Sequence, residues 1–391
     1  MPRAQDATLW TPELKRKAPG ADGPLIATDV ERRDGSRPSG PVEPEPQLPV
    51  GVIFADNFDD QPDWTSTLFS TDSAQIAATG HTLPVGWDAV YQGTQWSPET
   101  GHPDRNASIQ ILASNSDKVR TGTKSAVFWR ESYTNDSPDP FLWASDGQLV
   151  KLLPQEYDEL YVEFWIKFSP TWFGRAPSDV LSKSWASKIF RVGHWQENSN
   201  WGTLFNGALG YVGPLFLWNW MRDSFGIRNF QARRGGPPQS GSYGFQGNFQ
   251  GDFSGNYNTD MNGRGLNGTD ALVPDRVNGG WLKDAPGPIQ HDQIFGQVGD
   301  DWTKIAFYLK MNSAPGVPDG IYRQFINDVQ FNSVENVPWC STTPEGRMVG
   351  WNYFAIGGND WFHQFPPQDR YEDWYSIDNL VVRADMPEGV S

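Results

Sequence analysis

The chain of 391 residues contains 40 Gly, 31 Pro, 23 Phe, 19 Trp and 12 Tyr, and its formal net charge is −16. This composition is rich in turn-forming and aromatic residues, and it excludes a long helical bundle. Because so acidic a chain repels a phosphate backbone over most of its surface, we expect no nucleic-acid partner. Cys340 is the single cysteine, so an intrachain disulfide is excluded.

Residues 1–50 carry scattered charges and prolines and lack apolar periodicity, and the proline-rich run PVEPEPQLPVG spans their end. Such a segment cannot bury enough apolar surface to fold alone, and its prolines favour an extended polyproline II conformation. It is either a disordered tail or an extended arm that a neighbouring subunit orders, and we expect the arm.

The N-terminal segment shows no apolar run of signal-peptide length, and no later stretch of the sequence could span a bilayer. We therefore expect a protein made in the cytosol without membrane insertion. It would reach the outside on a virion surface or by a non-Sec secretion route.

From Val52 onward, short β-rich runs alternate with turn residues, a pattern typical of a two-sheet antiparallel sandwich. Alternation predicts that one face of these strands forms the core and that the other is either solvent-exposed or the floor of a ligand groove. Eight strands are predicted, at residues 51–58, 123–133, 159–168, 187–195, 213–220, 302–311, 320–328 and 374–383. The predicted core includes Val162, Phe164, Ile166, Ile305, Phe307 and Leu309, and the opposite face carries Trp165, Lys167, Tyr308 and Lys310.

Residues 229–300 are rich in Gly, Asn, Gln and aromatic residues without strand periodicity, and we interpret them as an insertion between two strands. The run NTDMNGRGLNGTD within them has enough Asp and Asn for a calcium loop but lacks the spacing of an EF-hand. A series of Gly/Asn turns is the favoured interpretation.

Several of these motifs resemble one fold family. The segments VIFADNFDD, VRTGTKSAVF, ELYVEFWIKFSPTW, KIFRVGHW and YSIDNLVVRADMP are similar to the concanavalin A-like lectin/glucanase jelly roll, in particular its polysaccharide-lyase-like branch. The resemblance implies an all-β two-sheet sandwich over residues 51–391 that binds glycans along its concave sheet. The fold hosts lectins, hydrolases, lyases and non-catalytic modules.

The first chemistry that the resemblance implies is β-elimination of a uronic-acid polysaccharide, which needs a carboxylate-neutralising group, a base and an acid. Departures from the family pattern oppose it, since the expected Arg-x-Glu-x-Arg strand survives only as WRESY. A half-buried hydrogen-bonding role is the alternative for His194. The residues implied for a lyase are Arg191, His194, Tyr308, Lys310, Tyr322 and Gln324.

Glycoside hydrolysis, the second chemistry, needs two carboxyl groups about 5 Å apart on one strand in a retaining enzyme. Glu163 stands alone among Tyr161, Trp165 and Lys167, and no predicted strand carries the pair. A hydrolase is therefore rejected.

Glycan binding without chemistry is the third possibility, because indole and phenol rings match the C–H faces of sugars. The predicted acidic-glycan groove consists of Trp165, Lys167, Arg191, Tyr308 and Lys310. Further stacking candidates, for which core packing is the alternative, are Trp201, Trp218, Trp220, Trp351, Trp361 and Trp374.

No cofactor is required by these chemistries, but relatives with this jelly roll often hold a structural calcium between the first and last strands. Asp56 in FADNFDD and Asp378 in SIDNL occupy the matching places. The alternative is that both carboxylates cap turns or accept backbone hydrogen bonds.

Two functions follow. The favoured hypothesis is a non-catalytic decoration protein of a bacteriophage-like particle, in which the N-terminal arm contacts other virion subunits and anchors a lectin-like jelly roll. The alternative is a polysaccharide lyase acting on a uronic-acid polysaccharide.

Overall fold

The computed structural model describes residues 48–66, 75–77, 82–92, 108–131, 141–169, 185–195, 214–223, 226–234, 302–315, 317, 319–337, 339–340, 348–363 and 372–390. The chain divides into two compact units, Met1–Val50 and Gly51–Ser391, and the architecture below is that of the second. Apart from residues 48–50, the predicted arm lies outside the described residues, as does the predicted insertion beyond residue 234. No helix in the described part of the chain is long and apolar enough to cross a membrane.

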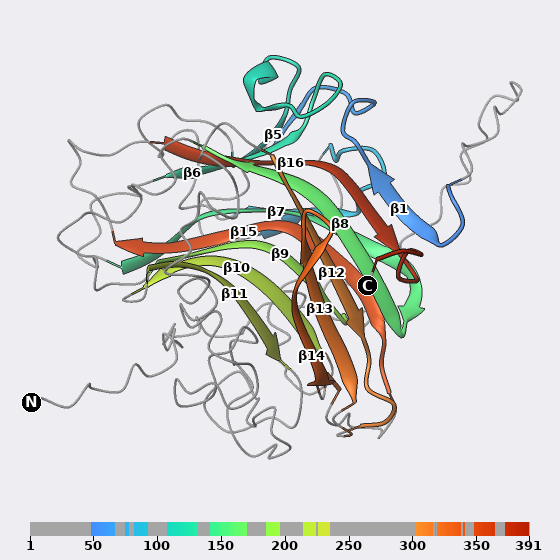
Figure 1. The fold of residues 1–391 in the computed structure, drawn as a ribbon. Helices are drawn as coiled ribbons and strands as arrows, with labels where there is room; N and C mark the ends of the chain where they lie inside the picture. Colours follow the sequence, from blue (N-terminus) through green and yellow to red (C-terminus); the bar gives the residue numbers. More distant parts are fainter. Residues whose placement is uncertain are drawn as a thin grey trace, which may run out of the picture. The chain divides into compact units, whose positions relative to one another are not determined.

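Within the described residues, sixteen strands form two antiparallel sheets (Figure 1). The nine-stranded sheet has the order β14 (Val329–Val337), β13 (Gly320–Ile326), β12 (Thr303–Lys310), β8 (Glu159–Phe168), β16 (Glu372–Arg383), β6 (Ala126–Glu131), β5 (Ile109–Ile111) and β2 (Trp64–Thr65), and β1 (Val52–Asp56) also pairs with β16. The seven-stranded sheet has the order β11 (Gly226–Arg234), β10 (Leu215–Asp223), β9 (Trp185–Gly193), β15 (Trp351–His363), β7 (Phe141–Tyr157), β4 (Ala89–Gln92) and β3 (Gln75–Ala77).

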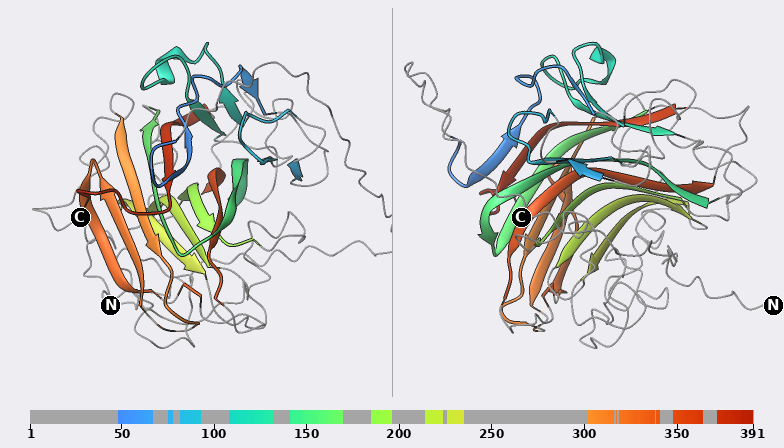
Figure 2. Two further views of the ribbon diagram at one scale, coloured as in Figure 1. Left: turned by 90° about the vertical axis from the view of Figure 1, so that its right-hand side faces the viewer. Right: turned by 180° about the vertical axis from the view of Figure 1, so that it is seen from behind.

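The two sheets stack face to face and bend in the same sense, with the seven-stranded sheet on the inner side of the bend (Figures 1 and 2). This is the predicted all-β, two-sheet antiparallel jelly roll. Each sheet has one face in the shared core and one outer face.

The core confirms the predicted register. Val162, Phe164, Ile166, Ile305, Phe307 and Leu309 are all 0% exposed. Across the sheet interface, the Phe307 ring lies 4.9 Å from that of Phe216 and 5.5 Å from that of Trp218, both in β10. Because every second residue of a strand faces the same side of the sheet, these six side chains of β8 and β12 all point between the sheets.

All eight predicted strands exist, with ends that differ by a few residues. The sequence reasoning missed the other eight described strands, β2, β3, β4, β5, β7, β11, β14 and β15, of which β7 and β15 are the longest and pair along most of their lengths. Turn-forming residues interrupt the strand pattern in the sequences of both: β7 contains Asp146, Gly147 and Pro154, and β15 contains the run GGND. The predicted insertion starts too early, because residues 229–234 belong to β11.

Strand β16 changes its partner along one edge. Residues 372–377 pair with β6, and β1 pairs from Leu380 to Arg383. The segment from Leu112 to Ser125, which joins β5 to β6 and contains the 3-10 turn η1 (Ser116–Lys118), reaches Asp378 between the two pairings. We call this segment the β5–β6 loop.

Candidate functional site

Three tryptophans stand on the outer face of the nine-stranded sheet. Trp165 lies in β8, Trp374 in β16 and Trp129 in β6, and each alternates with core residues of its strand. Trp374 is directly opposite Trp129, while Trp165 is opposite Asp378, four residues along β16. All three side chains are half-buried, so each presents part of its indole to solvent.

Cationic side chains of the β5–β6 loop lie against these indoles. The Lys118 Nζ is 5.4 Å from the ring centre of Trp129 and 5.1 Å from that of Trp374. The guanidinium carbon of Arg120 is 3.6 Å from the ring centre of Trp165. At these distances the electron-rich ring face attracts the cation, so each contact orders both partners.

Lys167 completes the arrangement from β8, where it is opposite Ser376, halfway between Trp374 and Asp378 along β16. Those two β16 positions are about 13 Å apart at a rise of about 3.3 Å per residue. The result is an alternation of aromatic and cationic side chains along the strands. We call it the Trp–cation row, and it consists of Trp129, Trp374, Lys167, Trp165, Lys118 and Arg120.

The exposed carboxylate of Asp117 borders the row. Its Oδ2 is 2.8 Å from the Lys118 Nζ. The hydrogen bond from Lys118 lowers the pKa of Asp117, and the nearby charge of Lys167 acts in the same direction. Two amide side chains flank the first indole, because Gln110 Oε1 accepts hydrogen bonds from Trp129 Nε1 at 2.9 Å and from Asn115 Nδ2 at 3.2 Å.

The buried carboxylate of Asp378 holds the middle of the β5–β6 loop. Its Oδ2 accepts the backbone N–H of Arg120 at 3.0 Å and that of Thr121 at 3.3 Å. Its side chain is fully buried, and burial raises the pKa of Asp378 to about 6, although the hydrogen bonds act in the opposite direction. The carboxylate thus fixes the backbone from which Arg120 reaches Trp165.

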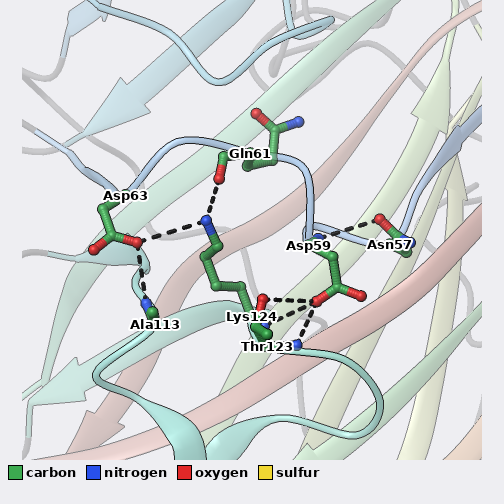
Figure 3. A network of polar contacts seen from close by, with 7 residues as sticks. All are labelled: Asn57, Asp59, Gln61, Asp63, Ala113, Thr123 and Lys124. Atoms are coloured by element: carbon green, nitrogen blue, oxygen red, sulfur yellow. Dashed lines mark hydrogen bonds and ion pairs between the residues drawn. The ribbon is translucent and has the colours of Figure 1, made fainter.

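Two more carboxylates hold the ends of the loop (Figure 3). Asp63 Oδ1 accepts the backbone N–H of Ala113 at 3.1 Å and lies 3.6 Å from the Lys124 Nζ. Asp59 Oδ1 accepts the backbone N–H groups of Thr123 and Lys124, the latter at 3.1 Å. Burial acts to raise the pKa of Asp59, but these hydrogen bonds outweigh it, and the pKa is lowered.

The predicted lyase residues Tyr308 and Lys310 lie on the same outer face but at its far end. They are opposite Tyr161 and Glu159, four or more residues along β8 from Trp165. The Tyr308 hydroxyl donates to Glu159 Oε2, and the Lys310 Nζ is 3.9 Å from the same oxygen. Burial and that hydrogen bond raise the pKa of Tyr308, so the phenol keeps its proton.

Tyr322 and Gln324 lie on the opposite side of the sheet, inside the sandwich. Both are 0% exposed, and the Tyr322 ring is 5.6 Å from that of Phe216 across the core. The Tyr322 hydroxyl donates to Gln324 Oε1 at 3.2 Å. These two side chains therefore face away from Tyr308 and Lys310.

Arg191 and His194 belong to the other sheet. Arg191 in β9 is opposite Leu217 and Ala355, alternates with core residues, and is 4% exposed on the inner, concave side of the bend. His194 follows β9, and its Nδ1 donates to the carbonyl of Gly350 at 3.0 Å. The six predicted lyase residues are thus not brought together.

The predicted glycan groove is corrected in the same way. Trp165 and Lys167 are neighbours in the Trp–cation row, Tyr308 and Lys310 are at the far end, and Arg191 is on the other sheet. Contrary to the expectation of a concave groove, the row lies on the outer side of the bend, because β8 and β16 belong to the nine-stranded sheet.

The predicted calcium ligands face opposite sides of one sheet. Asp56 is opposite the core residue Leu380, and its carboxylate accepts hydrogen bonds from Phe58 N at 2.7 Å and Trp87 Nε1 at 2.8 Å. Asp378 faces outward. Among the described residues, no group of three or more His, Cys, Asp or Glu side chains is arranged to hold a metal ion. N–H donors already engage both carboxylates, so these two residues do not fit a shared cation site.

The remaining tryptophan candidates divide between core and surface. Trp218 and Trp351 are 0% exposed in the core, whereas Trp374 belongs to the row. Trp220 lies in β10 and Trp361 in β15, and for these two residues the structure describes the strand but not the side chain. Trp201 lies outside the described residues.

Sequence reasoning missed Trp129, Lys118 and Arg120 as site residues. Alternation in the predicted strand 123–133 was a usable signal for Trp129. For Lys118 and Arg120 no local signal exists, because their positions depend on hydrogen bonds to Asp378, which is 258 residues from Arg120 along the chain.

No protein-family model and no curated protein sequence matches this chain. Among solved structures, an endo-β-1,4-glucuronan lyase from the fungus Trichoderma reesei is 12% identical, with coverage of 70% of this chain and 86% of that chain and a TM-score of 0.39. A marine alginate lyase from Aplysia kurodai is 9% identical (70% and 86% covered, TM-score 0.37). An endo-1,3-β-glucanase from Streptomyces sioyaensis is 12% identical (86% and 98% covered, TM-score 0.36). Likeness at this level says nothing about the substrate or site residues of this chain.

Proposed function

We propose that this protein is a polysaccharide-binding jelly roll that holds an acidic glycan on the Trp–cation row. The observation that carries the proposal is the alternation of three half-buried indoles with three cations on one face of the sheet. Indole faces pack against the C–H faces of sugar rings, and guanidinium and ammonium groups pair with carboxylate or sulfate groups.

The local charge supports an acidic ligand. Among the described side chains of the row and its border, the three cations Lys118, Arg120 and Lys167 outnumber the exposed carboxylate of Asp117, and the buried Asp378 lies beneath the loop. The whole chain has a net charge of −16, so this cationic patch reverses the sign of its surroundings. Local reversal of this kind steers a ligand of the opposite charge to one place on the surface.

Neither of the two functions predicted from the sequence is part of this proposal, for different reasons. A lyase that uses the six predicted residues is not proposed, because those residues lie on both outer faces and in the core. The virion role depends on the arm, residues 1–50, of which the structure describes residues 48–50. It stays a prediction and forms no part of this proposal.

Affinity electrophoresis tests the proposal, with alginate and heparin as acidic probes and dextran as the neutral probe. We expect both acidic polymers to retard the protein, and we expect added salt to reduce the retardation because it screens exposed charges. The matched variants are Trp374→Ala, which removes a central indole, and Tyr308→Phe, which changes an aromatic residue at the far end of the same face. Trp374→Ala should weaken binding about tenfold or more, as for other central aromatic contacts, and Tyr308→Phe should not change it. Absence of retardation by either acidic polymer at low salt would refute the proposal.

A further inference from the structure

The β5–β6 loop is tied to the rest of the unit at both ends and in the middle. Asp63 accepts the N–H of Ala113 at its start, Asp378 accepts that of Arg120 in its middle, and Asp59 accepts that of Lys124 at its end. Within the loop, the Ser125 hydroxyl donates to the Lys118 carbonyl at 2.6 Å. The backbone that carries Lys118 and Arg120 is therefore fixed by side chains outside the row.

The contact between the loop and Asp59 is especially close. Gly122 has a φ of +73°, and a Cβ built there would lie 1.8 Å from Asp59 Oδ2. The loop turns directly against this carboxylate, and a glycine at residue 122 permits both the positive φ and the approach. Figure 3 shows Asp59 beside Thr123 and Lys124, where the loop returns to the sheet.

Fixing the loop matters because a flexible cation binds weakly. Immobilising a long side chain on binding costs conformational entropy, and holding it beforehand in the bound geometry lowers that cost. Hydrogen bonds from backbone N–H groups to an ionised carboxylate are among the stronger hydrogen bonds in proteins. A carboxylate at the base of the loop can therefore raise the affinity of cations at its tip.

We propose that Asp59 is a positioning residue of the glycan site, which holds the β5–β6 loop so that Lys118 and Arg120 meet the anionic groups of the polysaccharide. The inference rests on the proposed function and adds to it a residue outside the binding surface. Charge and loop anchoring predict opposite changes in affinity when Asp59 is removed. Removing an acidic residue near a site for a polyanion should tighten binding by charge alone, whereas loss of the loop anchor should weaken it.

The experiment compares dissociation constants for heparin at several salt concentrations, by isothermal titration calorimetry, with melting temperatures measured alongside. Asp59→Ala should weaken binding about fivefold or more and reduce the salt dependence, because fewer cations reach the ligand together. Asp59→Asn keeps an acceptor oxygen and should retain most of the affinity. Asp319→Ala is the matched control, since Asp319 Oδ1 also accepts a loop N–H, that of Ser313 at 2.8 Å, away from the row. Its affinity should equal or slightly exceed that of the parent protein.

A second variant removes the anchor without changing any charge. Gly122→Ala drives a methyl group into the Asp59 carboxylate and should weaken heparin binding as Asp59→Ala does. Unchanged or tighter binding by folded Asp59→Ala or by folded Gly122→Ala would overturn the positioning role and leave the glycan site intact. A parent protein that binds neither heparin nor alginate would refute the site itself.

Discussion

The aromatic residues of the core and those of the Trp–cation row have the same chemistry but different neighbours. In the core, Phe307 is surrounded by other rings, such as Phe164 at 6.4 Å and Phe190 at 5.6 Å between ring centres. In the row, Trp165 and Trp374 meet cations instead. An aromatic ring enclosed by rings stabilises the fold, whereas a half-exposed ring beside a cation can also serve a ligand.

The largest expected effect is on the core side of this comparison. Phe307→Ala should lower the free energy of unfolding by about 3–5 kcal/mol, because it leaves a cavity between the two sheets. Urea denaturation followed by tryptophan fluorescence measures the change. Heparin affinity of the folded fraction should be unaffected, and a loss of affinity in protein shown to be folded would contradict the separation of core and row.

The buried Asp378, which holds the β5–β6 loop, should make the stability of the protein depend on pH. Because burial raises the pKa of Asp378 from 3.8 to about 6, the folded state binds this proton more tightly than the unfolded chain does. The contribution of Asp378 to the free energy of unfolding should therefore fall as the pH rises from about 4 to about 6, by up to about 3 kcal/mol. Above that range it should stay constant.

Urea denaturation of the parent protein and of Asp378→Asn between pH 4 and pH 7 isolates this contribution. The difference in stability, parent minus variant, should decrease with rising pH. For a variant of Asp59, whose pKa is lowered, we expect the opposite trend: the difference in stability, parent minus variant, should decrease as the pH falls. A parent-minus-variant difference that increases with pH for Asp378→Asn would contradict the assignment.

A smaller effect is expected when one cation of the row is exchanged. Arg120→Ala should weaken heparin binding about tenfold, corresponding to about 1.4 kcal/mol, with little change in melting temperature. Arg120→Lys should recover part of the loss, because an ammonium group keeps the charge but cannot stack on Trp165 with a planar face. Full recovery by lysine would show that the stacking contact at 3.6 Å is unimportant for binding.

The smallest effect is predicted for Lys310, which lies on the same face but outside the row. Its ion pair with Glu159 is partly exposed at 3.9 Å, and such pairs contribute at most about 1 kcal/mol. Lys310→Ala should leave both the melting temperature and heparin affinity nearly unchanged. A clear loss of affinity would extend the binding surface along β8 toward Glu159.

The accuracy of the sequence predictions follows from how local each signal is. In β8 and β12 every second residue from Val162 to Ile166 and from Ile305 to Leu309 is apolar, and these predicted core residues are confirmed at 0% exposure. Strand β7 continues through Gly147 and Pro154, residues that locally indicate turns. Pairing with β15 and β4 overrides that local preference, and pairing partners cannot be read from a single segment.

In the candidate site, too, local signals were sufficient for some residues and insufficient for others. Alternation alone correctly separates Trp165 and Lys167 from the core. It cannot say that Arg191 lies on another sheet, because sheet membership depends on the order of distant strands. The resemblance also implied that Asp56 and Asp378 share a site, but the bulge in β16 between Asp378 and Val381 sets the face to which each residue turns.

Pairing between the first and last strands affects how the chain can fold. Val52 of β1 is opposite Arg383 of β16, roughly 330 positions later in the sequence. Closing so long a loop is entropically slow, and folds dominated by such contacts reach the native state late. During synthesis, β8 and β6 cannot complete their pairing until β16 is made, because β16 lies between them in the sheet and follows the other described strands in the sequence. Nascent chains that stop before Glu372 would therefore expose unpaired strand edges, the kind of surface from which aggregation begins.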